Sequence, residues 1–307
     1  MKTALITGIT GQDGTYLANF LLNKGYKVFG GFKKSQSTNF WRLHYIGIYD
    51  NVELLQLDVL NSSDITEALN YSEPNEIYNL AAQSSVSESF SQPLDTSNVT
   101  GFGTVRMLDA IQKFNKKIKF YQASSSEMFG QNDSPIKNEN SRLQPVSPYG
   151  NAKVFAHKTA QMYRESYGMF ISCGILFNHE SPFRGLEFVT RKITSGIAKI
   201  ATKKQDKIHL GNLDAKRDWG FAGDYVKSMR MMLQQEKPDD YVIATGESHS
   251  VKDFLEESFN YAGLGDWQNY AEIDKKFYRP TDIDNLVGDS SKAKKELGWK
   301  HTTQFKE

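Results

Sequence analysis

The chain has 307 residues, of which 39% are hydrophobic and 24% charged, a balance typical of one large globular unit or two joined domains. Its formal net charge of +1 argues against a nucleic-acid or anionic-membrane partner. A single cysteine, Cys173, excludes an internal disulfide, no apolar run approaches the ~20 residues of a membrane helix, and the six histidines lack metal-ligand spacing, so we expect no metal site.

The N-terminal residues MKTALITGITG enter a strand directly, without the form of a signal peptide, so we expect a cytoplasmic protein. Strand-like and helix-like segments then alternate along the chain. The expected strands are Ala4 to Thr7, YKVFGG, VELLQL, EIYNLA, KIKFYQAS and FISCGILF, and the expected helices are Thr15 to Asn23, SSDITEALNY, Val99 to Phe114 and one that begins at Ser147 and Pro148. This alternation predicts an α/β fold with a Rossmann-type doubly wound parallel sheet, whose ligands lie at the carboxyl ends of the strands.

The pattern becomes less regular after residue 177. Helices are expected near Phe188–Thr202, Tyr225–Gln235 and Val251–Tyr261, with short strands at KIHL and DYVIAT. We therefore predict a dinucleotide-binding domain over residues 1–177. Residues 178–307 are predicted to form mainly a smaller lobe that covers the substrate, with some elements returning to the main sheet.

The motif TGITGQDG places Gly8, Gly11 and Gly14 between the first strand and the first helix. Glycines let the backbone turn sharply and approach a pyrophosphate, whose charge is met by the helix N-terminus. A tight strand-to-helix turn is the plainer interpretation, but the position in a βαβ unit favours dinucleotide binding.

The end of the second strand, GGFKKSQS, carries Lys33, Lys34 and Ser35 where a site that prefers NAD places an acid. Lysines attract the 2′-phosphate of NADP, so the sequence predicts NADP, with an exposed basic loop as the alternative. Asp58, at the end of the third strand, is a candidate contact of the adenine edge or a cap of the next helix.

Two later motifs carry groups suited to proton transfer. SPYGNAK places Tyr149 and Lys153 four residues apart on one face of a helix, where an ammonium lowers the pKa of a phenol. Such a tyrosine can exchange the hydroxyl proton that accompanies hydride transfer. FYQASSSEMFG places Ser125 and Glu127 at the mouth of a strand. A carboxylate there suits an enzyme that also removes a carbon-bound proton, although a helix-start or solvated acid is also possible.

Together, GITGQDG, NLAAQS, YQASSSE, SPYGNAK, GILFNHESP, FVTRKIT, RDWG, VIATGE and RPTDID resemble the GDP-mannose 4,6-dehydratase family of extended short-chain dehydrogenase/reductases, in order and over nearly the whole chain. The resemblance implies a lyase in which Tyr149 removes the C4 hydroxyl proton of a GDP-sugar while hydride passes to NADP⁺. It further implies that Glu127 takes the C5 proton and helps water to leave from C6, after which the hydride returns to C6. Ser125 would bind a substrate oxygen, and Lys153 would bind the nicotinamide ribose and tune Tyr149.

The resemblance also implies sets of binding residues. The cofactor contacts would be Gly8, Thr10, Gly11, Gln12, Asp13, Gly14, Lys33, Lys34, Ser35, Gln36, Asp58, Val59, Leu80, Ala81, Ala82, Gln83, Ser84, Lys153, His179 and Arg184. The substrate contacts would be Ser85, Ser126, Asn178, Val189, Lys192, Gly211, Arg217 and Arg279, with the two arginines on the pyrophosphate.

Some positions depart from the family pattern. Ser125 stands where the family commonly has threonine, Ser85 where it has histidine, Phe183 where it has arginine and Asp95 where it has tyrosine. The basic pair at 33 and 34 is usually arginine, and lysine lacks bidentate phosphate geometry. Because Phe183 and Ser85 are expected near the sugar or the nicotinamide, GDP-N-acetylglucosamine or a GDP-heptose stays open as the substrate.

Other readings and the assembly also stay open. A nucleotide-sugar reductase or epimerase would share the glycine motif and the Tyr149/Lys153 pair without needing Glu127. A non-catalytic NADP-binding protein is disfavoured, because every expected catalytic group is present. The family forms dimers or tetramers, and Phe40 and Trp41 would be unusual on a solvated loop, so we expect a homodimer or homotetramer or, alternatively, local packing of these rings.

Overall fold

The computed structural model describes residues 1–35, 38–131 and 134–307. Its centre is a seven-stranded sheet of the order β3-β2-β1-β4-β5-β6-β11, in which every neighbouring pair is parallel. The strands are β1 (Thr3–Thr7), β2 (Lys27–Phe32), β3 (Val52–Gln56), β4 (Glu76–Asn79), β5 (Lys119–Ser125), β6 (Ile171–Leu176) and β11 (Asp240–Ile243). This is the predicted Rossmann-type sheet, and its strand order reverses direction between β1 and β4.

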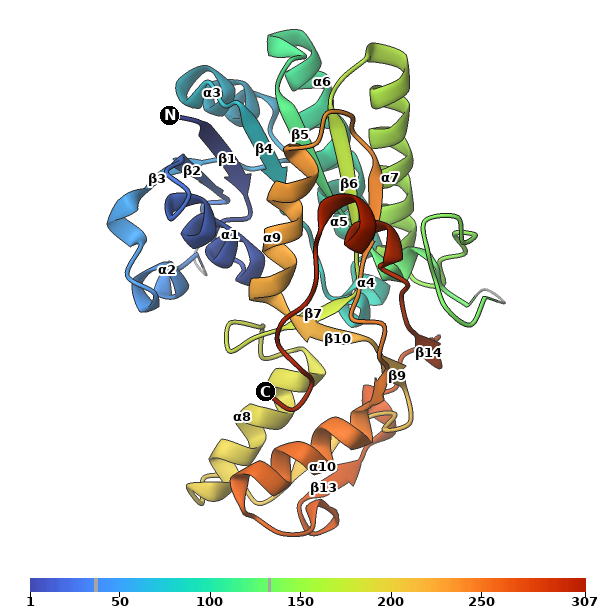
Figure 1. The fold of residues 1–307 in the computed structure, drawn as a ribbon. Helices are drawn as coiled ribbons and strands as arrows, with labels where there is room; N and C mark the ends of the chain where they lie inside the picture. The colour runs from blue at the N-terminus through green and yellow to red at the C-terminus, as the bar shows by residue number, and fades with distance from the viewer. Residues whose placement is uncertain (36–37, 132–133) are drawn as a thin grey trace.

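Helices cover both faces of this sheet (Figure 1). Ala4 and Ile6 of β1 share one core with α1 (Gln12–Leu22) and α9 (Ala222–Leu233). Leu5, which points to the opposite face, packs with α3 (Ser62–Ser72) and α6 (Gly103–Asn115), and α7 (Pro148–Tyr167) joins that layer. The alternation along β1 is the period of two that a strand buried on both sides requires.

Short helices connect the main elements. They are α2 (Trp41–Tyr45), α4 (Val86–Ser91), α5 (Pro93–Thr96) and the π-helical Ser97–Phe102. The helix expected from Val99 to Phe114 is therefore divided, with a π-helical turn before α6. Ser147 caps α7 as predicted, because its Oγ accepts the amide of Gly150 at 3.0 Å and Pro148 occupies the first turn.

The smaller lobe lies beyond the carboxyl ends of the sheet, at the bottom of Figure 1. Its core joins α8 (Val189–Ala201) and α10 (Val251–Ala262) to the paired strands β8 (Ile208–Leu210) and β13 (Ala271–Ile273). Two further small sheets connect it to the main body. They comprise β7 (Asn178–Glu180) with β10 (Trp219–Phe221), and β9 (Lys216–Arg217) with β12 (His249–Ser250) and β14 (Asn285–Leu286).

The chain after residue 178 contributes to both parts of the molecule. Both α9 and β11 follow the first strands of the lobe in the chain, but they belong to the main body. Helix α9 packs on α1, and β11 forms the edge strand beside β6. Asp218 joins the two parts, since its buried carboxylate accepts amide hydrogens from Thr245, Gly246 and Gly288. In the described part of the chain, no helix is long and apolar enough to cross a membrane.

Candidate active site

A cavity of about 730 Å³ lies between the carboxyl ends of the strands and the smaller lobe. It is lined by every residue that the sequence analysis assigned to catalysis or substrate binding, and by all but three of the predicted cofactor contacts. Gln36 lies outside the described residues. Lys34 and Gln83 do not line the cavity, and their assignment as cofactor contacts stays a prediction. Lys34 is exposed, and the amide of Gln83 instead bonds Glu88 and Thr96.

The glycine-rich turn is shaped for a close approach between backbone and ligand. Gly8 has a φ of 71°, and a Cβ at Gly14 would lie 2.5 Å from the carbonyl oxygen of Gly8. Gly11 occupies the N-cap of α1 and has no side chain to cap the first amides of the helix. Because this turn lines the cavity, these residues fit the diphosphate of a dinucleotide.

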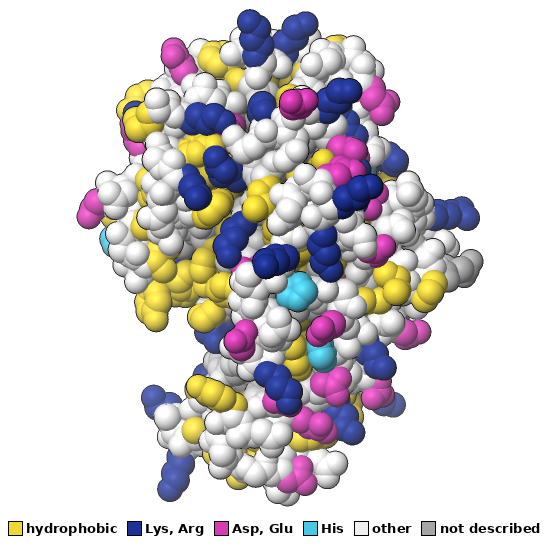
Figure 2. All heavy atoms as spheres, in the orientation of Figure 1, with side chains coloured by type: hydrophobic (Ala, Val, Ile, Leu, Met, Phe, Trp, Pro, Cys, Tyr) yellow, Lys and Arg dark blue, Asp and Glu magenta, His cyan; other side chains and the backbone are white. Residues whose placement is uncertain are grey.

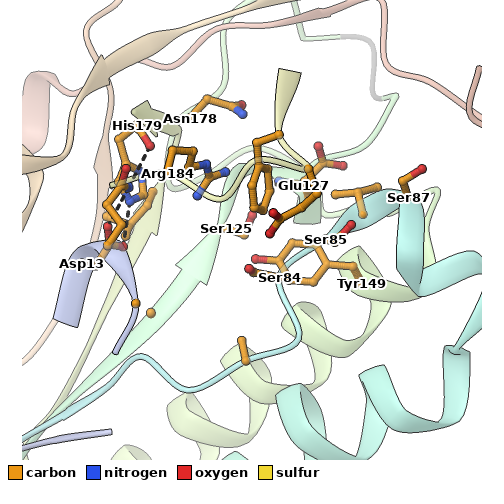
Figure 3. A pocket seen from close by; sticks show the side chains of 18 of the residues that line it. Asp13, Ser84, Ser85, Ser87, Ser125, Glu127, Tyr149, Asn178, His179 and Arg184 are labelled. Carbon is orange, nitrogen blue, oxygen red and sulfur yellow. Dashed lines mark hydrogen bonds and ion pairs between the residues drawn. The ribbon is translucent and has the colours of Figure 1, made fainter. Parts of the chain in front are cut away.

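Asp13 and His179, two predicted cofactor contacts, bind each other across the cavity wall (Figure 3). Nε2 of His179 lies 2.8 Å from Oδ2 of Asp13, and Nδ1 lies 2.7 Å from the carbonyl oxygen of Phe177. Although burial opposes it, the Asp13 carboxylate raises the pKa of His179, and the imidazole lowers the pKa of Asp13 despite burial. The pair holds the first turn of α1 against the chain that follows β6.

The end of the cavity near β2 contains the basic group expected for NADP. Lys33 lies 3.5 Å from the carboxylate of Asp58, so its charge is already shared. Asp58 accepts the amide of Leu60, whereas Asn61 caps α3. The helix-cap alternative for Asp58 is therefore wrong.

Arg42 also lines the cavity, and the sequence analysis missed it. Its guanidinium donates to the carbonyl oxygens of Thr10, at 2.9 Å, and Phe183, at 2.8 Å. Phe183 is 3% exposed and does not line the cavity, because its ring packs among Tyr16, Trp41 and Tyr45. The expectation that Phe183 lies near the sugar or the nicotinamide is therefore wrong.

Three consecutive residues at the end of β5 interact with side chains of α7. Lys153 Nζ donates to the carbonyl oxygen of Ala123 at 2.6 Å, and Ser124 Oγ lies 2.9 Å from Nδ1 of His157. Ser125, the third residue, interacts with the Tyr149 phenol and opposes the rise of its pKa. The strand end and the helix are thereby held together, and the predicted catalytic hydroxyls are brought into contact.

Burial dominates the ionisation of this group. It raises the pKa of Tyr149 to about 12, although the hydrogen bond from Ser125 opposes the rise, and it lowers the pKa of Lys153 to about 8. In this structure burial therefore outweighs the lowering that was expected from Lys153. The ammonium lies 5.7 Å from the centre of the phenol ring and is directed to a backbone carbonyl.

Glu127 lies two residues beyond the end of β5, on the 3-10 turn Ser126–Met128. Its amide donates to Oγ of Ser125 at 3.2 Å, which places its carboxylate on the same wall as Tyr149. Figure 3 shows Ser125, Glu127 and Tyr149 together, with Ser84 and Ser85 beside them. Glu127 is only 8% exposed, so the interpretation as a solvated loop acid is wrong.

The lobe supplies cations to the opposite wall. Arg217 Nη2 bonds Oδ1 of Asp282 at 2.7 Å, and Arg279 lies 3.7 Å from the same carboxylate. Lys192 Nζ lies 3.3 Å above the ring of Phe277. A Cβ at Gly211 would lie 2.6 Å from the carbonyl oxygen of Phe277, so only glycine fits there. Asp282 lies in the RPTDID motif, but neither it nor Phe277 was assigned to the site, and their position in the cavity wall identifies them.

Within the ranges 1–35, 38–131 and 134–307, no group of three or more histidine, cysteine, aspartate or glutamate side chains is placed to hold a metal ion.

Comparison with known proteins gives one consistent result. The family model described as GDP-mannose 4,6 dehydratase matches residues 5–307. GDP-mannose 4,6 dehydratase 1 of Arabidopsis thaliana is 51% identical over 99% of this chain and 86% of its own length. Two solved structures share the fold at 20% identity, each with a TM-score of 0.87 and 99% of this chain covered. They are UDP-glucose 4-epimerase of Thermotoga maritima, with 95% of its chain covered, and the dTDP-glucose 4,6-dehydratase DesIV of Streptomyces venezuelae with NAD and TYD bound, with 93%.

Proposed function

The chain belongs to the GDP-mannose 4,6-dehydratase family, and we propose that it converts GDP-mannose to GDP-4-keto-6-deoxymannose and water. The observation that carries this proposal is the position of Glu127 beside the Ser125–Tyr149 pair in one cavity. A carboxylate base next to a hydride-transfer site is what a dehydratase needs, whereas an enzyme that moves only hydride has no use for it.

Tyr149 and Ser125 act on the C4 hydroxyl. A bound nicotinamide dinucleotide supplies the hydride acceptor for C4 and later the hydride for C6. The Ser125 hydroxyl holds the C4 oxygen, and Tyr149 Oη receives its proton as the carbonyl forms. Because burial raises the pKa of Tyr149 to about 12, proton removal requires added positive charge near the phenol. Lys153 places an ammonium in the same cavity, and the positive charge of a bound oxidised nicotinamide would add to it.

Glu127 carries out the elimination. The C4 ketone acidifies the C5 hydrogen, which Glu127 removes as a proton. The same carboxyl then protonates the departing C6 hydroxyl, so that one water leaves and Glu127 is again ionised. Hydride adds to C6 and a proton adds to C5, which balances the proton that C4 released. The low exposure of Glu127 favours this role, because a base shielded from bulk water retains its proton for the leaving group.

We propose that the dinucleotide is NADP. Lys33, with Ser35 nearby, lines the β2 end of the cavity, where a 2′-phosphate would compete with Asp58 for the ammonium. Arg42 lies at the same end, held on the carbonyls of Thr10 and Phe183. The small side chains of Ala81 and Ala82 leave room for the cofactor to lie against the protein backbone. A ratio of dissociation constants for NADP⁺ and NAD⁺ near one would contradict this choice.

We propose that the lobe binds the GDP portion. Lys192, Arg217 and Arg279 place three cations on one wall, and a diphosphate is the part of the substrate with matching charge. Asn178, Val189 and Gly211 complete that wall. Ser85 and Ser126 lie on the sugar side near Glu127. The contribution of each side chain to binding is measured as the change in KM for GDP-mannose when that side chain is substituted.

The alternatives differ from this function in specific residues. The epimerase and dehydratase structures share this fold equally, so the fold does not separate them. Glu127 in the cavity favours the dehydratase. Ser85 also lines the cavity, so turnover of GDP-N-acetylglucosamine and a GDP-heptose beside GDP-mannose tests the sugar. A tenfold preference for GDP-mannose would discard the modified sugars.

Glu127→Gln is the decisive test. The variant keeps the shape of the side chain but cannot remove the C5 proton, so the 4-keto-6-deoxy product should fall about 10²- to 10⁴-fold. Reduction of the cofactor by C4 oxidation should persist, because Tyr149 and Ser125 are intact. Mass spectrometry of the sugar and absorbance of the reduced cofactor measure the two steps. Glu165→Gln, at an exposed position of α7, is the matched control. Full product formation by Glu127→Gln would contradict the base assignment.

We also propose that the chain forms a homo-oligomer through the surface of α2. Phe40 packs locally against Phe32 and Tyr49, whereas Trp41 is 45% and Tyr45 75% exposed. Figure 2 shows hydrophobic side chains gathered over this helix. The mass in solution tests the proposal, and a monomer at micromolar concentration would contradict it.

A further inference from the structure

Four charged side chains form a continuous series across the cavity. Arg217 bonds Asp282 at 2.7 Å, Asp282 lies 3.7 Å from Arg279, and Nη1 of Arg279 lies 3.9 Å from Oε1 of Glu127. Arg217, Asp282 and Arg279 come from the lobe, and Glu127 follows β5 of the main sheet. The last contact therefore joins the wall with the cations to the wall with the base.

The two arginines are held in different ways. Arg217 is buried in the wall, and its Nη1 also donates to the carbonyl oxygens of Ile283, at 2.7 Å, and Lys216, at 2.8 Å. The side chain of Arg279 is 32% exposed, and its two ion pairs with Glu127 and Asp282 are both longer than 3.5 Å. It lies on the chain between the 3-10 turn Lys275–Phe277 and β14. Arg217 is thus a fixed cation, and Arg279 is free to change its partner.

We propose that Arg279 is a positioning residue that couples the diphosphate site to the base, by exchanging Glu127 for the substrate diphosphate when the nucleotide binds. The inference rests on the proposed function, since Glu127 is taken as the base and GDP as the nucleotide. A diphosphate carries more negative charge than one carboxylate and can accept bidentate bonds, so it competes for the guanidinium. Asp282 keeps Arg279 close to Arg217, which is where a diphosphate would bridge the two arginines.

The exchange makes proton removal conditional on a seated nucleotide. Before GDP-mannose binds, Arg279 draws the Glu127 carboxylate towards the lobe. Once the diphosphate takes Arg279, Glu127 is released towards C5 of the sugar. Coupling between two binding events is reciprocal, so the Glu127 charge must also weaken the binding of a diphosphate through its competition for Arg279.

Binding of GDP to the whole chain measures this coupling without requiring turnover. Calorimetry at fixed ionic strength compares the wild type, Glu127→Gln, Arg279→Gln and the double variant. Glu127→Gln should bind GDP about threefold more tightly, since a competitor for a partly exposed arginine is removed. Arg279→Gln should bind GDP more weakly. The double variant should match Arg279→Gln alone, because the gain acts through Arg279.

Two outcomes would overturn the proposal. The same gain from Glu127→Gln in both backgrounds would mean general charge repulsion, and no gain in either would mean that Glu127 and the diphosphate do not share Arg279. Arg279→Lys guards against misfolding, since it keeps the charge and should retain part of the gain, and the thermal midpoint is measured for every variant. Product formation by the wild type is assayed separately, so a failure of the proposed function is distinguished from a failure of this coupling.

Discussion

The two walls of the cavity are held in different ways. On the sheet side, two successive residues of β5, Ala123 and Ser124, bond Lys153 and His157 of α7 at 2.6 Å and 2.9 Å. On the lobe side, Arg279 makes ion pairs of 3.7 Å and 3.9 Å and is partly exposed. We infer that the wall assigned to hydride and proton transfer is preorganised, whereas the wall assigned to the nucleotide adjusts when the ligand binds.

The strongest way to break the preorganised wall is Tyr149→Phe. The ring still packs in its buried position, but the hydroxyl that bonds Ser125 and exchanges the C4 proton is lost. Product formation should fall about 10²- to 10⁴-fold, with GDP affinity unchanged. Tyr167→Phe, at an exposed position near the end of the same helix, is the control. Less than a tenfold loss of kcat in Tyr149→Phe would show that another group exchanges this proton.

A second test concerns His157, which joins α7 to Ser124 behind the site. Burial lowers its pKa to about 4, although Asp240 opposes this and Lys158 and Arg164 add to it. The folded pKa lies below the ordinary 6.5, so between these values the unfolded chain binds a proton that the folded chain does not. The contribution of His157 to the free energy of unfolding is therefore fully present above pH 6.5. It falls by up to about 3 kcal/mol as the pH drops from 6.5 through 4.

His157→Gln removes this dependence. At pH 7 the variant should be about 1 to 2 kcal/mol less stable, because the bond to Ser124 is weakened in a buried place. At pH 5 the difference should shrink or reverse. Urea titrations at both pH values measure it, with His209→Gln on an exposed strand of the lobe as the control. A constant difference would contradict a neutral, buried His157.

The adjustable wall should respond less to single changes. Lys192→Met removes a cation that packs on Phe277 and lines the cavity. The KM for GDP-mannose should rise about threefold with little change in kcat, because the contact forms equally in the ground state and the transition state. Lys199→Met, exposed on the same helix, is the control. An unchanged KM would mean that Lys192 serves packing alone.

Much of the sheet side of the cavity could be predicted from the sequence, and less of the lobe side. The strands, the glycine turn and the Ser147 cap of α7 follow from short-range patterns. Phe183 was misplaced, because the direction of a side chain near a strand end depends on what packs against it. Arg42, in the short helix α2, and Asp282, in the RPTDID segment, were not assigned to the site, since no local pattern marks the partner of a charged side chain.

The order of apolar residues, the glycines and the motif spacings by themselves determined a parallel sheet, its ligand edge and the residues that meet there. These are local requirements of backbone geometry and burial, so they are visible in neighbouring residues. Only the tertiary structure decided which charges pair and how deeply each group is buried. The high pKa of Tyr149, the sharing of Asp282 by Arg217 and Arg279, and the contact of Arg279 with Glu127 depend on residues far apart in the chain. Desolvation and Coulomb energy depend on distance in space, and the sequence does not give that distance.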